Sequence, residues 1–332
     1  MPHGACGTKG RQKMSFTILG TGSYAPEHVV TNDDLSKLVE TNDEWITQRI
    51  GVKSRHICET ETNVDLAVQA SQRALENAGV QPEELDLIIA TTISGDTLSP
   101  GTGCMVQNRL GAHCPAFDIA AACSGFLFGL ETAAGFLARG LYKRVLVVSA
   151  ERMSGIVDWT DRSTCCIFGD GAGAVVLGPG DGLVASHLMT KGGDGVIKIP
   201  THYGNSPWYK GEVPEKTSIY MNGRETYKFA VMAMSDNIKA LMEHAGVSGE
   251  DVALVIPHQA NYRIINEARR RIPDIAPEKF CINIDRYGNT SSASVPILLD
   301  EMNRAGKIHR GDLLVLAAFG GGLSAGAMII RF

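Results

Sequence analysis

An ungapped internal repeat constrains the fold of this chain more than any other feature. Residues 76–89 (ENAGVQPEELDLII) match residues 243–256 (EHAGVSGEDVALVI), with Gly79 aligned on Gly246, an offset of 167 residues. Each copy has the pattern of a helix end, a glycine that stops the helix, a short acidic turn and a buried strand. Two unrelated helix–turn–strand units can look alike, but several identities in register favour a duplication.

Strand-like apolar runs alternate with helix-like stretches along the whole chain, which is typical of an α/β protein. The runs are nearly continuous, as in strands buried on both faces by covering helices. The pairing between halves continues more loosely, since residues 145–149 match 313–317 and residues 173–177 match 326–330. The clearest strand-like runs are Leu85–Ala90, Val145–Ser149, Ala174–Leu177, Val252–Ile256 and Leu313–Ala317.

The repeat predicts two similar halves, stacked face to face about a pseudo-twofold axis. We place their boundary in the glycine- and proline-rich stretch Gly178–Gly182, which gives an N-terminal half of residues 14–182 and a C-terminal half of residues 183–332. The polar residues 1–13 lack the apolar segment of a secretory signal, and we expect a disordered extension.

Composition narrows the functional classes. The chain has 332 residues, 44% of them hydrophobic, and a net charge of -5, so it can bury a large core and has no global signature of nucleic-acid binding. The sequence contains no run of eighteen or more apolar residues, so we expect no membrane span. The 8 cysteines are irregularly spaced without a CxxC pair, which favours reduced thiols in the cytoplasm and argues against structural zinc.

Cys123 is the strongest candidate nucleophile. It lies between a short strand, Phe117–Ile119, and a helix-like stretch, Phe126–Leu137. The N-terminus of a helix stabilises a thiolate and lowers its pKa, so we expect an activated thiol. The ordinary alternative is a small buried hydrophobic residue, the role of most free cysteines. Adding the repeat offset to Cys123 gives Thr290, so the two turns should face one site near the axis.

His258 and Asn289 are the other candidate polar residues of this site. His258 follows the strand Val252–Ile256 through Pro257, at a strand's carboxyl end, where α/β proteins place ligands. Asn289 lies among glycine and small polar residues, which let the backbone approach a ligand closely. A locally bonded histidine and a simple turn or helix cap are the alternatives.

Three glycine-rich segments suggest backbone contacts with ligands. Gly320–Gly322 follow an apolar strand, and their N–H groups could hold an oxyanion. Residues 20–25 (GTGSYA) fit a dinucleotide-binding pattern, but Pro26 stands where the phosphate-binding helix should begin. Residues 169–173 (GDGAG) lack the Gly-Lys-Ser/Thr of a phosphate-binding loop. These last two features argue against nucleotide binding and against an NAD-dependent dehydrogenase.

Several motifs together resemble the β-ketoacyl-acyl-carrier-protein synthase III family, whose members start bacterial fatty acid synthesis. The resemblance runs in order from about Phe16 to Phe332. It is carried by residues 122–125 (ACSG), 257–261 (PHQAN), 287–291 (YGNTS) and 319–322 (FGGG), with weaker matches at 42–46 (NDEWI), 51–57 (GVKSRHI) and 168–173 (FGDGAG).

The resemblance implies a thiolase fold, with two βαβαβαββ halves in five α-β-α-β-α layers, and a homodimer. It also implies that Cys123, His258 and Asn289 are catalytic, and that the N–H groups of Cys123 and Gly321 form the oxyanion hole. Cys123 would accept an acyl group from acyl-CoA, and decarboxylation of malonyl-carrier protein would supply the attacking carbanion. No metal or redox cofactor is implied.

The family also implies two binding surfaces, one for CoA and one for acyl carrier protein. Trp45 and Arg162 would stack on either side of the adenine. A partner subunit's loop, here about Ile93–Pro100, would close the acyl pocket; its lack of an aromatic residue suggests room for primers larger than acetyl. The CoA residues would be Thr41, Trp45, Arg49, Arg162, Gly223 and Asn261. Those for the acidic carrier would be Gln259, Ala260, Asn261, Tyr262, Arg263, Lys228, Arg270 and Arg271.

Arg224 and Tyr227 depart from the family, which commonly has Asn and Phe there. Two rival functions remain. A related condensing enzyme of secondary metabolism, for a quinolone or a polyketide starter, would have the same fold and site. A non-catalytic carrier-binding subunit would typically lack the cysteine.

Overall fold

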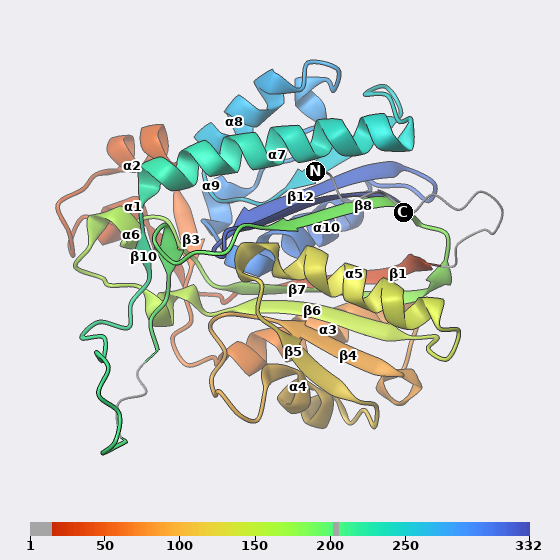
Figure 1. Cartoon of the computed structure of the whole chain (residues 1–332), viewed down its shortest axis with the longest axis horizontal. Helices are drawn as coiled ribbons and strands as arrows, with labels where there is room; N and C mark the ends of the chain where they lie inside the picture. Colours follow the sequence, from red (N-terminus) through yellow and green to blue (C-terminus); the bar gives the residue numbers. More distant parts are fainter. Residues whose placement is uncertain (1–14, 202–205) are drawn as a thin grey trace.

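The computed structural model describes residues 15–201 and 206–332. The extension predicted for residues 1–13 lies outside this range. Two β-sheets lie face to face, with a layer of helices between them and another on each outer face (Figure 1). This is the five-layered α/β arrangement expected from the sequence.

The N-terminal sheet has the strand order β1-β7-β6-β4-β5. β4 pairs in parallel with β5 and β6, whereas β7 runs antiparallel to β6 and β1. β5 therefore forms one edge of the sheet. The strands are β1 (Ser15–Tyr24), β4 (Leu87–Thr91), β5 (Ala116–Ile119), β6 (Val145–Glu151) and β7 (Gly171–Gly180).

The C-terminal sheet repeats this order as β11-β12-β13-β8. A parallel bridge between Val255 and Phe280 marks the place that β5 has in the first sheet. The two sheets therefore have equivalent connectivity, as the internal repeat predicted. The strands are β8 (Leu183–Thr190), β11 (Val252–Pro257), β12 (Leu313–Gly320) and β13 (Ser324–Arg331).

The helices complete the layers. α3 (Asn63–Ala78) and α4 (Thr102–Leu110) cover the outer face of the N-terminal sheet, and α7 (Gly223–Ala245) and α8 (Tyr262–Arg271) cover that of the other (Figure 1). α5 (Gly125–Ala138) and α10 (Ser294–Arg304) lie between the sheets. The shorter elements are β2 (Val29–Thr31), α1 (Asn32–Leu35), α2 (Asp43–Arg49), β3 (Ser54–His56), α6 (Arg162–Cys165), β9 (Ile197–Lys198), β10 (Tyr220–Met221) and α9 (Ile284–Tyr287).

Strand pairing refines the offset between the halves. Leu87 of β4 lies opposite Val145 of β6, and Leu254 of β11 lies opposite Leu314 of β12. The offset is thus 167 residues at β4 and β11 but 169 at β6 and β12. The C-terminal half has two more residues between these strands.

This insertion moves the expected partner of Cys123. The 3₁₀ turns Ala122–Ser124 and Ser291–Ala293 precede α5 and α10, and each begins with a positive φ, 46° at Ala122 and 49° at Ser291. Cys123 is therefore equivalent to Ser292, not to Thr290 as the constant offset predicted. Asn289 is equivalent to Ala120.

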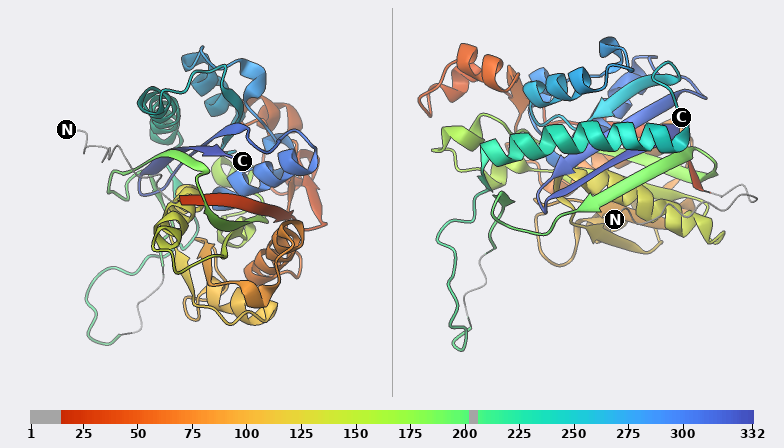
Figure 2. Two further views of the ribbon diagram at one scale, coloured as in Figure 1. Left: turned by 90° about the vertical axis from the view of Figure 1, so that its right-hand side faces the viewer. Right: turned by 45° about the horizontal axis from the view of Figure 1, so that its top comes forward.

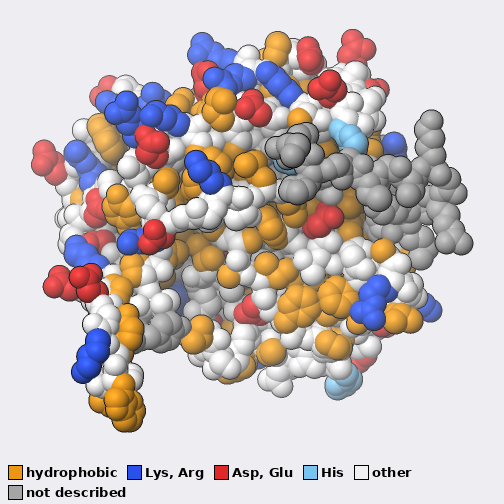
Figure 3. All heavy atoms as spheres, in the orientation of Figure 1, with side chains coloured by type: hydrophobic (Ala, Val, Ile, Leu, Met, Phe, Trp, Pro, Cys, Tyr) orange, Lys and Arg blue, Asp and Glu red, His pale blue; other side chains and the backbone are white. Residues whose placement is uncertain are grey.

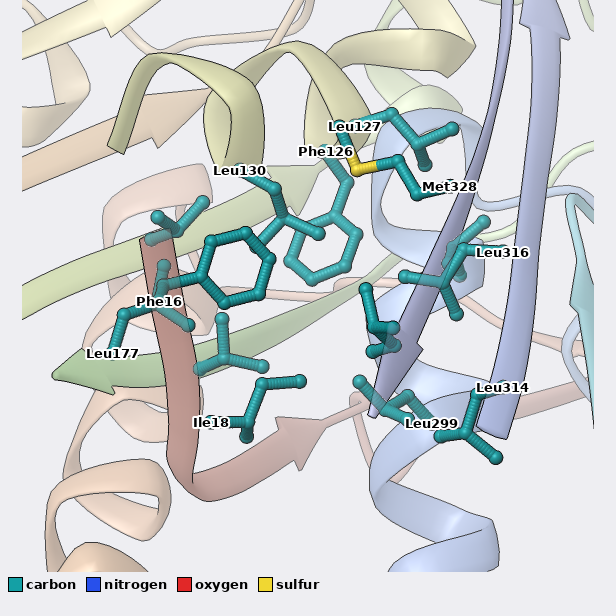
Figure 4. Close-up of a cluster of buried hydrophobic side chains, with 14 of the residues drawn as sticks. Phe16, Ile18, Phe126, Leu127, Leu130, Leu177, Leu299, Leu314, Leu316 and Met328 are labelled. Carbon is teal, nitrogen blue, oxygen red and sulfur yellow. The ribbon is translucent and has the colours of Figure 1, made fainter. Parts of the chain in front are cut away.

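The central layer is the largest apolar core. Side chains of α5 and α10 meet the inner faces of both sheets, and the resulting cluster is almost completely buried (Figure 4). Burial of this surface contributes roughly 25 cal/mol per Å² to folding. It also holds the two turns in place. The cluster includes Phe16, Ile18, Phe126, Leu127, Leu130, Leu177, Leu299, Leu314, Leu316 and Met328.

Glycines in the rejected nucleotide motif have a packing role. Gly20 and Gly22 lie within β1, where an added Cβ would come 2.4 Å from the backbone nitrogen of Ala78 and 2.3 Å from that of Ala74. Only glycine lets α3 pack this closely on the strand. The repeated glycines Gly79 and Gly246 end α3 and α7 with φ of 64° and 65°, as predicted.

Residues 206–218 extend away from the layered body on the side where the 3₁₀ turn Met153–Ile156 and β10 lie (Figure 2). In the parts of the chain that the structure describes, none of the helices is both long and apolar enough to cross a membrane.

Candidate active site

Cys123 lies in the turn between β5 and α5. An added Cβ on Gly320, the last residue of β12, would come 2.7 Å from the Cys123 backbone nitrogen and 3.0 Å from its Cβ. Glycine at position 320 therefore allows the end of β12 to pack directly on the turn that contains Cys123. Gly321 and Gly322 continue along the same wall of a cavity.

The surroundings of Cys123 correct one expectation. Burial, with a smaller contribution from the nearby Glu151 carboxylate, raises the pKa of its thiol to about 12, although the neighbouring Ser291 hydroxyl acts to lower it. The sequence predicted a lowered pKa from the N-terminus of the following helix. Because low-dielectric surroundings disfavour the thiolate, Cys123 is a neutral thiol at rest.

His258 follows β11 and is almost fully buried, at 1% exposure. Its Nδ1 lies 2.6 Å from the Ser294 hydroxyl, and its ring makes an edge contact with Phe319. Burial lowers the pKa of His258 to about 3, so the imidazole is neutral near neutral pH.

The hydrogen bonds around Ser294 are consistent with one tautomer of His258. The Ser294 oxygen accepts the Gln259 backbone N–H at 3.4 Å, and its hydroxyl hydrogen can then be donated to Nδ1. With Nδ1 accepting, the imidazole hydrogen is on Nε2. A neutral histidine with this tautomer is a hydrogen-bond donor to the cavity.

Hydrogen bonds to neighbouring residues fix the orientation of the Asn289 side chain. Its Oδ1 accepts the Ser291 N–H at 2.8 Å, and its backbone bonds to Ile167 and Gly169. The oxygen is thus occupied, and the side-chain NH₂ group is left as the donor. Asn289 therefore presents N–H groups rather than an acceptor.

One cavity of about 940 Å³ is lined by Cys123, His258 and Asn289 together. Its walls come from both halves of the chain, and most of the lining is apolar, as in many ligand sites. The residues from the N-terminal and C-terminal turns meet here as the repeat predicted. Further lining residues include Ile93, Leu98, Phe168, Tyr227, Phe319 and Gly321.

The residues expected to bind CoA divide into two groups. Trp45, Arg49, Gly223 and Asn261 line this cavity, whereas Thr41 and Arg162 are absent from its lining. The Arg162 guanidinium lies 4.9 Å from the Trp45 ring centroid, as in direct stacking. The two side chains therefore contact each other directly, and an adenine would have to enter between them.

The expected carrier surface needs one correction. Gln259 is fully buried, where Nε2 donates to the Pro257 carbonyl and Oε1 accepts from the Asn283 N–H. Its side chain is thus out of reach of a docked partner and ties two loops together instead. Ala260 lines the cavity, and Asn261 caps α8.

The remaining residues of that surface lie on α8 and the start of α7. Lys and Arg side chains gather over these helices, with acidic side chains among them (Figure 3). Arg270 and Arg271 lie 3.7 and 3.8 Å from Glu267, and Lys228 bonds Glu225. The exposed positions are Tyr262, Arg263, Arg270, Arg271 and Lys228.

Three further polar residues near the site were missed from the sequence: Glu151, Ser291 and Ser294. A signal existed for Glu151, which ends a mostly apolar run, residues 145–151 (VLVVSAE). The serines had none, because small polar residues are ordinary in turns. The described residues contain no group of three or more His, Cys, Asp or Glu side chains able to hold a metal ion.

Comparison with known proteins places this site in a family. Residues 117–192 match the model 3-Oxoacyl-[acyl-carrier-protein (ACP)] synthase III, and residues 242–332 match the model of its C-terminal part. The β-ketoacyl-[acyl-carrier-protein] synthase III of Clostridium acetobutylicum is 44% identical over 322 residues, which cover 96% of this chain and 99% of that protein.

Solved structures agree with this match. The Aquifex aeolicus 3-oxoacyl-[acyl-carrier-protein] synthase III has a TM-score of 0.88 and 45% identity, over 96% of this chain and 100% of the other. The priming β-ketosynthase of the R1128 polyketide pathway has a TM-score of 0.89 and 34% identity over 98% of both chains. The fold is that of these enzymes, and the chain belongs to the β-ketoacyl-acyl-carrier-protein synthase III family of acyltransferases.

Proposed function

We propose that this chain catalyses the decarboxylative condensation of an acyl-CoA primer with malonyl-carrier protein, which starts fatty acid synthesis in the cytoplasm. The observation that carries the proposal is the meeting of Cys123, His258 and Asn289 at one apolar cavity. A thiol can carry the acyl group there, and two N–H donors can stabilise a negative charge.

The first half-reaction is acyl transfer to Cys123. Its sulfur attacks the thioester carbonyl of acyl-CoA, and the backbone N–H groups of Cys123 and Gly321 hold the resulting oxyanion. The close packing of Gly320 on Cys123 supports this pairing, since it brings the two backbones together. The carbon–sulfur bond to CoA then breaks, and CoA leaves as a thiol.

The second half-reaction forms the carbon–carbon bond. Malonyl-carrier protein loses carbon dioxide, and the electron pair forms an enolate on the thioester. The Nε2–H of His258 and the NH₂ group of Asn289 donate hydrogen bonds to the enolate oxygen. Its carbon attacks the acyl-Cys123 carbonyl, and the 3-oxoacyl carrier product frees the cysteine. Side chains and backbone N–H groups of this chain provide the nucleophile and the hydrogen-bond donors for these steps, so the proposal includes no cofactor.

A panel of acyl-CoA thioesters tests the proposed acyl transfer to Cys123. Intact-protein mass spectrometry after mixing with acetyl-, isobutyryl- and hexanoyl-CoA should show the mass gain of one acyl group. The Cys123→Ser protein should gain none. Absence of a gain with all of these thioesters would contradict the proposed function.

We also propose that α8 docks an acidic carrier protein, with Arg263 as its central contact. The Arg263 guanidinium lies 5.9 Å from the Tyr227 ring centroid, and Tyr227 lines the cavity, so this cation stands at the cavity mouth. Arg263→Glu should weaken the use of malonyl-carrier protein and leave Cys123 acylation by acyl-CoA intact. Lys307→Glu, after α10, is the matched control; equal loss of both steps in Arg263→Glu would argue against docking.

A homodimer is part of the proposal. Leu98, in the loop between β4 and α4, is 81% exposed, and Leu141, in the loop between α5 and β6, is 70% exposed. Pairing of two chains through these loops would cover both leucines and bring Leu98, which already lines the cavity of its own chain, close to the partner's cavity. Sedimentation should give about twice the monomer mass, and Leu98→Asp should shift the equilibrium to the monomer.

A second candidate function is priming of polyketide synthesis, which the similarity to the R1128 ketosynthase favours. Condensation assays with malonyl groups on fatty-acid and polyketide carrier proteins separate the two. A non-catalytic carrier-binding subunit is less consistent with a cysteine, a histidine and an asparagine at one cavity. Detection of an acyl-Cys123 adduct would exclude it.

A further inference from the structure

Glu151 is a completely buried carboxylate at the end of β6, and its two oxygens face different segments of the chain. Oε1 accepts the Ser292 hydroxyl hydrogen at 2.6 Å. Oε2 accepts Ser94 Oγ at 2.5 Å and the Ile93 N–H at 3.1 Å, and Thr92 Oγ1 adds a further hydrogen bond to it at 3.2 Å. The carboxylate therefore connects the turn before α10 to the loop that follows β4.

The loop after β4, residues 92–98, is one wall of the cavity that contains Cys123. It adjoins the two turns at that cavity, because an added Cβ on Gly125 would come 3.1 Å from the Thr91 Cβ and 3.2 Å from the Ser292 Cβ. A shift of this loop would thus change the space next to the turn that contains Cys123. The residues of the loop that line the cavity are Thr92, Ile93, Gly95, Thr97 and Leu98.

Polar contacts hold this loop at two places. Asp96 accepts two backbone N–H groups at the start of α3, both at 2.9 Å. Nearer to β4, three of the four hydrogen bonds of Glu151 go to the loop, and Ser94 Oγ also accepts the Arg152 N–H at 2.9 Å. The position of the first half of the loop therefore depends on the Glu151 carboxylate.

The carboxylate is a costly group for this place. Among the ion pairs of the described residues, none pairs Glu151 with a cation. Burial raises its pKa, whereas hydrogen bonds from Ser292, Ser94 and the Ile93 N–H act to lower it. Burying a carboxylate without a cation costs free energy that an apolar side chain would not cost. What the carboxylate adds is a set of directional hydrogen bonds to two segments at once.

We propose that Glu151 is a positioning residue that sets which acyl primers fit beside Cys123. It holds the wall formed by residues 92–98 at a fixed distance from the turn before α10. A wall held by directional hydrogen bonds limits the size of the acyl chain, whereas a released wall can move to admit a longer one. Glu151 does not line the cavity and acts through the loop. This inference rests on the proposed acylation of Cys123 and adds a determinant of its primer.

The experiment measures kcat/KM for acylation of Cys123 by acetyl-, isobutyryl- and hexanoyl-CoA. Glu151→Ala removes every acceptor, so the value for hexanoyl-CoA relative to acetyl-CoA should rise by at least about tenfold, the scale on which an apolar pocket distinguishes one methylene group. Glu151→Gln keeps one oxygen for the Ile93 N–H and should retain most of the parent's ratio. An unchanged ratio in Glu151→Ala would overturn the proposal.

Two further variants separate the position of the wall from folding. Ser94→Ala removes one donor of the loop and should shift the ratio in the same direction by a smaller factor. If Glu151→Ala does not fold, Ser94→Ala decides, and an unchanged ratio there rejects the proposal.

Asp300→Asn is the matched control. Asp300 is equally buried and accepts the Thr21 and Ser23 hydroxyls, both at 2.6 Å, but it does not line the cavity or contact the loop. This variant should lower the melting temperature and leave the primer ratio unchanged. A shift in Asp300→Asn as large as that in Glu151→Ala would assign the effect to lost stability and overturn the positioning role.

Hydrogen exchange of a peptide that contains residues 92–96 tests the wall without any acyl transfer. Exchange should be faster in Glu151→Ala than in the parent protein and unchanged in Asp300→Asn. If no thioester acylates the parent while exchange shows this pattern, the proposed function fails and the anchoring of the loop stands. Acylation of Glu151→Ala with the parent's primer ratio and the parent's exchange rates rejects the role of Glu151 alone.

Discussion

The turns before α5 and α10 have the same backbone and different chemistry. Each begins with a positive φ, forms one 3₁₀ turn and leads into a helix of the central layer. At the 169-residue offset, Cys123 corresponds to Ser292 and Ala120 to Asn289. The first turn supplies a thiol to the cavity, whereas the second supplies donors and directs Ser292 to Glu151.

This difference separates what a duplicated backbone provides from what its side chains add. The close approach of the turns comes from the fold, because both helices pack in the same apolar layer. The different chemical groups that the two turns present come from a few residue differences between them. Variants that make the two turns alike therefore test which substitutions carry the function.

The largest effect is expected when Cys123 is replaced by the residue type of its counterpart. Cys123→Ser gives both turns a serine, and a serine hydroxyl is a far weaker nucleophile without a dedicated base. We expect acyl-enzyme formation to fall by at least about 10³-fold, in the range seen for removal of catalytic nucleophiles. Quenched mass spectrometry measures the rate.

Cys104→Ser is the control for this change. Cys104 is an exposed free thiol on α4, and its loss should leave acylation unchanged. An acyl group that attaches to the Cys123→Ser protein at the rate of the parent would assign the nucleophile to another thiol.

Asn289→Ala gives the second turn the alanine of the first. It removes one donor to the enolate but none from the oxyanion formed on Cys123. Condensation should therefore fall by about 10²–10³-fold, as for loss of an oxyanion-hole donor, while acylation stays nearly unchanged. Release of carbon dioxide from malonyl-carrier protein measures the first, and adduct mass the second. Equal loss in both would place Asn289 in the support of the turn.

The sequence predicted the equivalence of the two halves well where it depends on local sequence patterns. The glycine stops, the apolar strands and the ordered motifs predicted the two sheets and the meeting of Cys123, His258 and Asn289. It missed the two-residue shift in the offset, because an insertion between strands leaves no mark in either strand.

Side-chain surroundings could not be predicted in the same way. Gln259 stands beside an exposed helix in sequence but is buried by loops that arrive from residues 281–284. The pKa of Cys123 depends on burial by both halves, which outweighs the helix N-terminus that the local sequence suggested. Such effects are set by tertiary contacts, so a single segment does not reveal them.

The residues at the ends of β4 and β11 also differ, and this difference affects the stability of the protein rather than a reaction rate. At the 167-residue offset His258 corresponds to Thr91, which does not titrate. The pKa of His258 is lowered from 6.5 to about 3, so between these values the unfolded chain binds a proton that the folded chain does not. The free energy of unfolding should therefore fall as pH drops below about 6.5, with a limiting slope of about 1.4 kcal/mol per pH unit.

Denaturant unfolding from pH 7 to 4 measures this loss. The buried Glu151 and Asp170, whose pKa values are raised, act with the opposite sign and must be subtracted. His258→Gln retains them and removes only the imidazole, so its stability should fall less on acidification. Parallel curves for the two proteins would show that His258 does not titrate between the folded and unfolded states in this range.

The smallest effect tests the backbone equivalence itself. Glycine adopts a positive φ without the cost that a Cβ carries, but loses more freedom on folding, so Ala122→Gly should stabilise the protein by about 0.5–1 kcal/mol. Ser291→Gly relieves the same strain and also removes a buried hydroxyl without a partner, which should add about 1 kcal/mol. Both changes are measured by thermal unfolding. If Ala122→Gly destabilises the protein while Ser291→Gly stabilises it, the first turn depends on its methyl group against Gly321, and the two backbones are not energetically equivalent.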